Sequence, residues 1–420
     1  MPFIKFGRFS TKMWYPFLMG ITSFFNTVVT KIIAFYIRKR EESEAKRIFV
    51  MLIYMFIGEM LAFILFIFQS KEIQIEKEKI SINSQSNMTT IPKIKKIGLF
   101  KVILIILGVT LLDTFSSFIF NYVKCLTLSF TEFMLRMLLI MITMLISSWM
   151  LKIKFGIHQR LSMVTLFTIV IIMFIFTLNW NKIDIHNSSW WESTKNTLIL
   201  IPIIMVSQIA AGLVECFEKK LMEEYFLSPF LIIMTEGICG LFIIIPISLS
   251  VSSLLYSKFK NNVFPTWKGV LKEIKLNFMF APEALSAVGR VVALFWFNVF
   301  RLLTNHSFTP CHRSIADTIT TFFRWILSII GIAYNSKMFG PKHNSENIEV
   351  GDIIFQFVIY LVIFFDIAIY IELIILNVCG LETDTSTFIR IREEKEIQSI
   401  REIVEELPES NLHWSEEKTD

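Results

Sequence analysis

The stretch LSFTEFMLRMLLIMITMLISSWML covers residues 128–151 and contains one acid and one arginine, Glu132 and Arg136, in an otherwise apolar run. It is longer than the roughly 20 residues that a helix needs to cross the hydrocarbon core of a bilayer. A strand is excluded, because an open strand in lipid leaves its backbone polar groups unpaired. The stretch therefore predicts a transmembrane helix with charges in its first turns.

Comparable apolar runs recur along the chain, in which 54% of the residues are hydrophobic and 18% are charged. We expect an all-α polytopic membrane protein with ten transmembrane helices. The eighth is the hardest to delimit, because Arg290 interrupts a run that begins as early as Ala284. The ten predicted spans are 14–36, 48–68, 100–120, 128–151, 161–178, 197–217, 229–249, 291–303, 315–334 and 353–378.

Three segments lie outside the predicted membrane body. Residues 1–13 form a short basic tail and 70–98 a polar loop expected to be mobile. Residues 381–420 form an acidic tail whose apolar spacing suggests a short amphipathic helix; the tail is interpreted either as a solvated segment with some helix or as a helix that binds a partner. Lysine and arginine are more frequent in the two tails and the even-numbered loops than in the odd-numbered loops. Because basic residues mark the cytoplasmic side, we expect both termini in the cytosol.

Two coincidences indicate an internal duplication. An SFT sequence precedes the arginine at 129–131 and again at 307–309, and Gly-Glu neighbours occur in the second and seventh spans as IGEM (57–60) and TEGICG (235–240). Five spans per half would make the halves inverted relative to one another, a common plan of transporters. The predicted repeats are 14–178 and 197–378, and chance similarity of such short motifs remains the alternative.

Ionisable residues inside spans are costly, so by default they face a partner or a wet cavity. Glu132 and Arg136 are four residues apart, as are Arg313 and Asp317, and both spacings place the two charges on one helix face. Each pair is interpreted either as an ion pair that holds helices in register or as an arginine that binds an anionic substrate.

Other charges receive their own interpretations. Glu59 and Glu236 are partners for these arginines or have a structural role, and the first span carries a polar stripe that includes Asn26 and Lys31. A further set of charges, interpreted as the solvated surface of a loop, comprises Lys219, Lys220, Glu223 and Glu224.

Several segments together resemble the drug/metabolite transporter superfamily, and within it the nucleotide-sugar-transporter-like solute carrier family 35, F subfamily. The chain departs from that pattern where Glu132 replaces a glutamine, Met137 a glycine and Thr320 a second arginine. The segments that carry the resemblance are NTVVTK (26–31), GE (58–59), LSFTEFMLR (128–136), ECFEKKLMEEYFLSPF (215–230), TEGICG (235–240), FN (297–298) and RSIAD (313–317).

The resemblance implies a secondary transporter that moves a small polar or anionic, nucleotide-sugar-like metabolite across an internal membrane of the Golgi, endoplasmic reticulum or lysosome type, by alternating access. The alternative is a non-transporting scaffold or receptor that acts through its acidic tail. The implied substrate-binding residues are Asn26, Lys31, Glu59, Glu132, Arg136, Glu236, Asn298, Arg313 and Asp317.

No enzymatic activity, cofactor or metal is expected, since the sequence lacks GxSxG and HExxH motifs. The expected partners are the small-molecule substrate and the lipid bilayer, with a homodimer as an open alternative to a monomer. Nucleic acid is not an expected partner, because the basic residues are spread over loops that flank spans.

Overall fold

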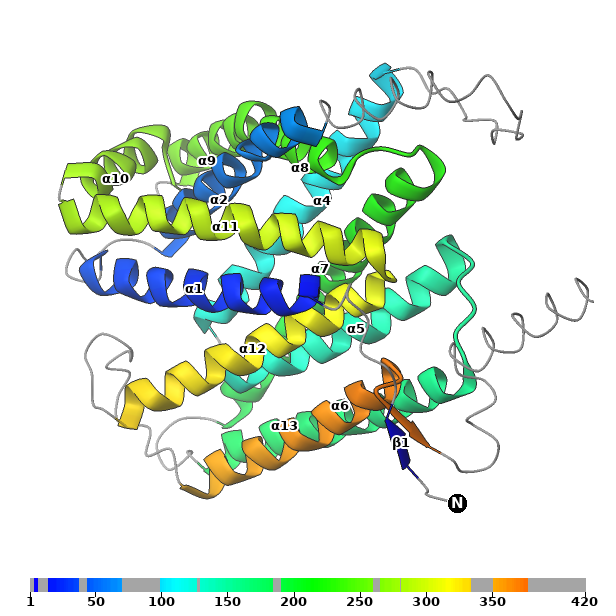
Figure 1. The fold of residues 1–420 in the computed structure, drawn as a ribbon. Coiled ribbons are helices and arrows are strands. Elements are labelled where there is room, and N and C mark those ends of the chain that lie inside the picture. The colour runs from blue at the N-terminus through cyan, green and yellow to red at the C-terminus, as the bar shows by residue number, and fades with distance from the viewer. Residues whose placement is uncertain are drawn as a thin grey trace, which may run out of the picture. The chain divides into compact units, whose positions relative to one another are not determined.

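The computed structural model describes residues 4–6, 14–37, 44–69, 99–126, 129–183, 190–259, 265–279, 281–333 and 350–376 (Figure 1). Within these ranges the side chains of 30–37, 121–136 and 174–201 are among those that are not described. The chain divides into two compact units. One comprises Met1–Phe9, Lys154–Leu166 and Leu361–Asp420, and the other Ser10–Ile153 and Phe167–Tyr360.

The larger unit is built from helices. They are α1 (Trp14–Ile37), α2 (Glu44–Met60), α4 (Leu99–Leu126), α5 (Ser129–Met150), α7 (Trp190–Glu224), α8 (Pro229–Cys239), the π-helical segment η2 (Gly240–Ile244), α9 (Ile245–Phe259), α10 (Trp267–Met279), α11 (Ala281–Ser307) and α12 (Pro310–Ala333). After a turn at Leu61 the second helix continues over 62–69. Two helices pass from one unit into the other, α6 (Ile157–Ile183) and α13 (Val350–Tyr370).

The helical fold class is confirmed, and five helices of the described chain are long and apolar enough to cross a membrane. They are Ile48–Gln69, Phe100–Phe120, Pro229–Ser257, Ala284–Ser307 and Ile353–Tyr370. The other predicted spans fall on α1, α5, α6, α7 and α12. Shorter apolar stretches, Met137–Met150 and Ile157–Met173, lie on two of these helices.

The predicted end of the last span at 378 is wrong. The helix ends at Tyr370, and Glu372 has a positive φ of 59°, which a continuing helix does not accept. The chain then forms strand β2 (Ile374–Leu376), which pairs antiparallel with β1 (Ile4–Phe6) in the smaller unit. In the same unit Asp366 accepts hydrogen bonds from Ser162 (2.9 Å) and Thr165, which link α13 to α6.

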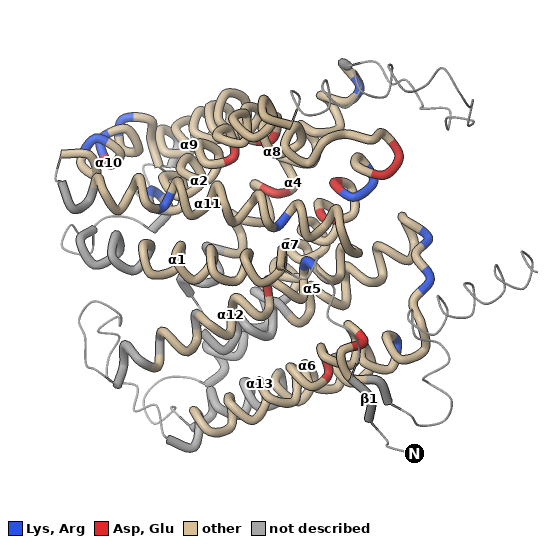
Figure 2. Tube along the Cα trace, viewed as in Figure 1, with Lys and Arg blue, Asp and Glu red and all other residues tan. Residues whose placement is uncertain are grey.

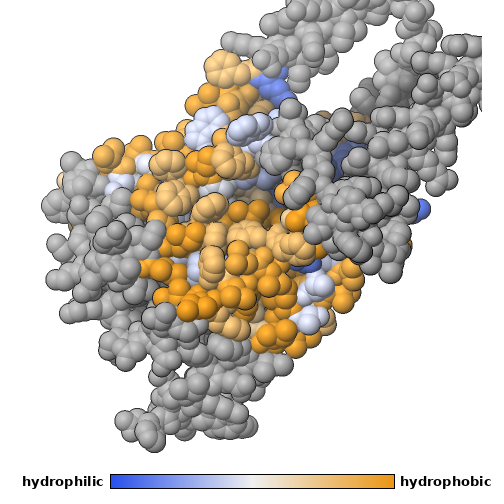
Figure 3. Space-filling view, turned by 60° about the horizontal axis from the view of Figure 1, so that its bottom comes forward, coloured by the Kyte–Doolittle hydropathy of each residue, from blue (hydrophilic) through white to orange (hydrophobic). Residues whose placement is uncertain are grey.

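Large apolar side chains cover much of the described surface that Figure 3 presents. Several are strongly exposed, including Leu145 at 70% and Trp149 at 80% on α5, and Leu254 at 70% on α9. Surfaces of soluble proteins avoid large contiguous patches of this kind. These helices therefore have the outward faces of an integral membrane protein.

Glycines set the distance between α2 and its two neighbours. A Cβ atom at Gly58 would lie 2.9 Å from the carbonyl oxygen of Val291 on α11, and one at Gly237 on α8 would lie 2.6 Å from the backbone nitrogen of Met60. At Gly240, where the π-helical segment begins, a Cβ would lie 2.2 Å from the Phe56 ring. The two Gly-Glu sequences are thus close helix crossings, of the small-residue type common in membranes.

The remaining pairings are also defined. The helix α1 packs against α11 and α12, α4 against α7 and α8, and α5 against α7 and α12. Figure 1 shows α11 between α1 and α2, and both of these contacts are extensive. The short helix α10 packs against α11 and α2.

The Gly237 crossing generates a testable prediction. Replacing Gly237 with Ala places a methyl group against the backbone of α2, which cannot move aside as a flexible side chain would. We therefore expect the free energy of unfolding to fall by about 1–3 kcal/mol. The measurement is the melting temperature of the detergent-solubilised protein. Gly108→Ala on α4 is the matched control, because nothing lies within 4 Å of its added Cβ. Equal melting temperatures for the two variants would contradict the close crossing.

Candidate functional site

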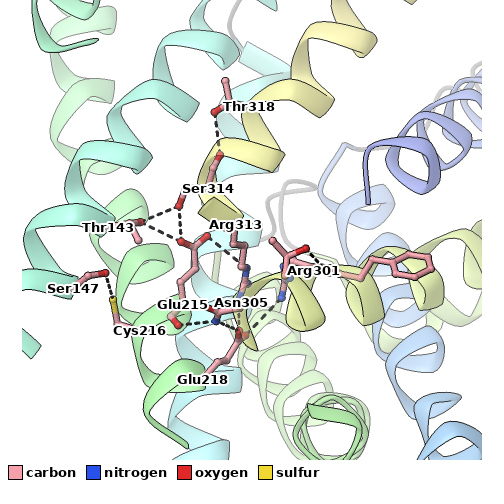
Figure 4. Close-up of polar contacts among 12 residues, drawn as sticks. Thr143, Ser147, Glu215, Cys216, Glu218, Arg301, Asn305, Arg313, Ser314 and Thr318 are labelled. Atoms are coloured by element: carbon pink, nitrogen blue, oxygen red, sulfur yellow. Dashed lines mark hydrogen bonds and ion pairs between the residues drawn. The ribbon is translucent and has the colours of Figure 1, made fainter. Parts of the chain in front are cut away.

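A buried guanidinium between two buried carboxylates forms the centre of the candidate site (Figure 4). Arg313, in the first turn of α12, bonds Glu218 through Nη1, and its Nε lies 3.6 Å from Oε1 of Glu215. The three side chains are only 1–3% exposed. Glu215 and Glu218 are three residues apart on α7, a spacing that directs both towards the same neighbouring helix.

The helix α11 adds a second guanidinium and an amide to this centre. The Nη2 atom of Arg301 lies 3.8 Å from Oε1 of Glu218. Asn305, one turn further along α11, donates from Nδ2 to the backbone oxygen of Glu215 (2.9 Å) and to Oε2 of Glu218 (3.3 Å). Glu218 is therefore shared by two arginines and an asparagine from two different helices.

Hydroxyl groups complete the shell of Glu215. Ser314 donates to its Oε2 at 2.5 Å, and Thr143 on α5 donates to the same oxygen at 3.2 Å. Next to them, Ser147 Oγ lies 3.2 Å from Sγ of Cys216 (Figure 4). Four helices, α5, α7, α11 and α12, thus meet at one ion-paired and hydrogen-bonded core.

A second group of acids lies on the helices that cross at the glycines. Glu59 on α2 accepts a hydrogen bond from Asn298 Nδ2 at 2.8 Å through its Oε1, while its Oε2 is buried without a hydrogen-bond partner among the described residues. Glu236 on α8 likewise has a buried, unpartnered Oε1. Asp113 on α4 lies within electrostatic range of both carboxylates and of Arg301.

Acids outnumber arginines in this part of the described chain. The interacting carboxyl groups are those of Glu59, Asp113, Glu215, Glu218, Glu236 and Asp317, and the guanidinium groups are those of Arg301 and Arg313. A buried charge is stable only if it is paired, neutralised by a proton or coordinated to a ligand. The arrangement therefore suits protons or a cationic or neutral polar molecule, and no group of described residues has the arrangement of a metal site.

Five of the nine predicted site residues are buried inside the described helices. Glu59, Glu236, Asn298, Arg313 and Asp317 are buried on α2, α8, α11 and α12, as listed above. Asn26 is half-buried on α1. Three more lie on described helices, but their side chains fall outside the described residues: Lys31, Glu132 and Arg136.

Two interpretations of the charges need correction. Arg313 forms its ion pairs with Glu215 and Glu218 on another helix, not with Asp317 on its own helix. Lys219 is not on a solvated loop, because α7 continues to Glu224; the Lys219 side chain is buried and donates to the backbone oxygen of His306 at 2.9 Å. A same-helix spacing of four shows only that two groups can meet, whereas Arg313 forms its ion pairs with glutamates on a neighbouring helix.

Sequence reasoning missed Glu215, Glu218 and Arg301 as site residues. Glu215 lies inside the predicted sixth span and Arg301 inside the eighth, so a charge within an apolar run was the available signal for both. Glu218 follows the predicted end of the sixth span by one residue and was assigned to a loop. The extension of α7 by almost two turns places it in the core.

The ion pairs of Arg313 generate a second prediction. Arg313→Gln removes the guanidinium that pairs with Glu215 and one of the two that face Glu218, so we expect a loss of about 3–5 kcal/mol in the free energy of unfolding. The double variant Arg313→Gln, Glu218→Gln should recover most of this loss, because it also removes a buried negative charge. Thermal unfolding in detergent measures both, with Lys220→Gln on the exposed end of α7 as control. An unchanged melting temperature for Arg313→Gln would disprove the pairing.

Comparison with known proteins adds no assignment: neither a protein-family model nor a curated protein matches this chain. The resemblance to solute carrier family 35 therefore stays a prediction from the sequence.

Proposed function

We propose that the protein is a secondary transporter that moves a small polar metabolite by alternating access, with the buried charges as its substrate and coupling site. The observation that carries the proposal is the set of ionisable side chains in apolar helices, centred on Glu215, Glu218 and Arg313. Such groups in membrane segments are expensive and mark substrate or ion pathways.

The helix pairings support two inverted five-helix repeats. We match α1, α2, α4 and α5 with α7, α8, α11 and α12, in that order. The more extensive pairings then correspond to one another: α1–α11 to α7–α4, α5–α7 to α12–α1, and α2–α11 to α8–α4. The pairs α2–α8 and α5–α12 correspond to themselves. A pseudo-twofold axis between the halves produces this pattern, and it is the architecture in which transporters place their sites.

The direction of the α2–α8 pair agrees with that axis. Gly237 meets Met60 and Gly240 meets Phe56, so the two helices run antiparallel. By contrast, α2 and α11 run parallel, since Gly58 meets Val291 and Glu59 meets Asn298. An inverted repeat of five spans requires the self-matched pair to be antiparallel.

The charge balance bears on the substrate class. Because both arginines already face carboxylates, a neutral or cationic cargo, or proton exchange, fits the described groups directly. An anionic, nucleotide-sugar-like cargo would have to displace Glu215 or Glu218 from Arg313, with protonation of the released acid. In both cases the internal membrane and the cytosolic termini remain part of the proposal.

The test begins with the purified full chain and a panel of nucleotides, nucleotide sugars, amino acids and small peptides. A ligand of the native state raises the melting temperature by mass action and identifies the substrate class. Uptake of the best compound into proteoliposomes then tests transport. No uptake, together with loss of cellular function on removal of residues 385–420, would favour the scaffold or receptor alternative.

The unpartnered acids generate a third prediction. We expect Glu59→Gln and Glu236→Gln to reduce uptake at least about tenfold while the melting temperature is retained or raised, because each removes a buried carboxylate with an unpartnered oxygen. Glu224→Gln, on the exposed end of α7, is the matched control and should transport normally. Normal uptake by both buried variants would remove these acids from the mechanism.

A further inference from the structure

We propose that Arg290, together with Tyr54 and the helix α10, binds an oxyanion such as a phosphate group. Arg290 lies on α11 and is 7% exposed. Its Nε and Nη1 atoms are buried and have no hydrogen-bond partner among the described residues. Arg301 and Arg313, by contrast, each face a carboxylate. A guanidinium buried without a counter-charge is costly, and a bound anion removes that cost.

The neighbouring polar groups point to an acceptor-rich ligand. Tyr54 on α2, 2% exposed, lies within electrostatic range of Arg290. The hydroxyl oxygen of Tyr54 accepts a hydrogen bond from Asn277 Nδ2 on α10 at 3.2 Å, which leaves the phenolic hydrogen for another acceptor. Glu273 is buried on α10 and acts electrostatically on Tyr54.

The helix α10 adds positive charge outside this donor group. One face of the helix is buried through Val270, Glu273 and Asn277, while Lys268, Lys272 and Lys275 are exposed at spacings of four and three. Figure 2 shows these basic residues gathered on α10. Exposed apolar residues such as Leu271 and Phe278 accompany them. A short helix with a basic stripe and apolar neighbours is typical of the membrane interface, where anionic groups are concentrated.

The location separates this group from the central charges. Arg290 and Tyr54 each lie six residues after the start of an apolar helix, Ala284–Ser307 and Ile48–Gln69, or about 9 Å along the axis at 1.5 Å per residue. Arg301 is a further three turns along α11.

The planar guanidinium group of Arg290 fits the tetrahedral oxygens of a phosphate group. That phosphate is carried either by a lipid headgroup at the interface or by a soluble metabolite.

The experiment uses the full chain, stripped of lipid in a neutral detergent, and three probes: inorganic phosphate, dioctanoyl phosphatidic acid and dioctanoylglycerol. The glycerol lipid has the same chains without the phosphate group. We expect at least one phosphate probe to raise the melting temperature and dioctanoylglycerol to have no effect. A response to both phosphate probes identifies a free oxyanion site, and a response to the phosphatidic acid alone identifies a lipid headgroup site.

Variants determine whether the response belongs to Arg290. Arg290→Gln should weaken phosphate binding about ten- to hundredfold, the loss expected from charge-assisted hydrogen bonds, and Tyr54→Phe should weaken it less. Without probes, Arg290→Gln should be at least as stable as the wild type, because it removes an uncompensated buried charge. Lys220→Gln on α7 is the control for loss of a positive charge and should bind normally. No response to either phosphate probe, a response unchanged in Arg290→Gln, or a loss of stability in the probe-free Arg290→Gln protein would overturn the proposal.

Discussion

The ion pairs of Arg313 with Glu215 and Glu218 are the interaction on which the larger unit depends. In an apolar environment neither the arginine nor the two acids can be left alone, because no water is present to replace a lost partner. The pairing therefore determines how α12 lies along α7. Asn305 and Arg301 contact Glu218 and so attach α11 to the same centre. Thr143 donates to Glu215 and so attaches α5.

Close helix packing supplies the second constraint. At Gly58, Gly237 and Gly240 the helices approach until a single methyl group would collide with backbone or with the Phe56 ring. These contacts bring α8 and α11 against α2 and place Glu59 next to Asn298. Glu59 follows Gly58 and Glu236 precedes Gly237 in the sequence. The close crossings at these glycines therefore also bury the two neighbouring acids.

The buried charges fall into two physical classes. Arg313, Glu215 and Glu218 are compensated by protein groups and stabilise the packing of helices. Oxygen atoms of Glu59 and Glu236, and nitrogen atoms of Arg290, have no hydrogen-bond partner in the described part of the chain. The free energy of burying such atoms is recovered only by a proton, an ion or a ligand. Beside the ion-paired centre, the second class therefore supplies further atoms that can bind a proton, an ion or a ligand.

The sequence by itself determined the class of the molecule. The length and apolarity of the runs predicted helices, and five of the predicted spans recur as apolar helices of membrane-crossing length. Four residues that these runs singled out, Glu59, Glu236, Asn298 and Arg313, are buried. These properties depend on local composition, which a sequence displays directly.

Only the tertiary structure decided which charges meet. The spacing of Arg313 and Asp317 places both on one helix face, yet the arginine forms its ion pairs with two glutamates on α7. The end of the apolar run predicts a loop that contains Glu218 and Lys219, whereas α7 continues to Glu224. Within the described part of the chain, the Nε and Nη1 atoms of Arg290 have no hydrogen-bond partner, a property that depends on every helix packed around them. Contacts between helices depend on how faces from distant segments are oriented, and the linear pattern of residues carries no record of that orientation.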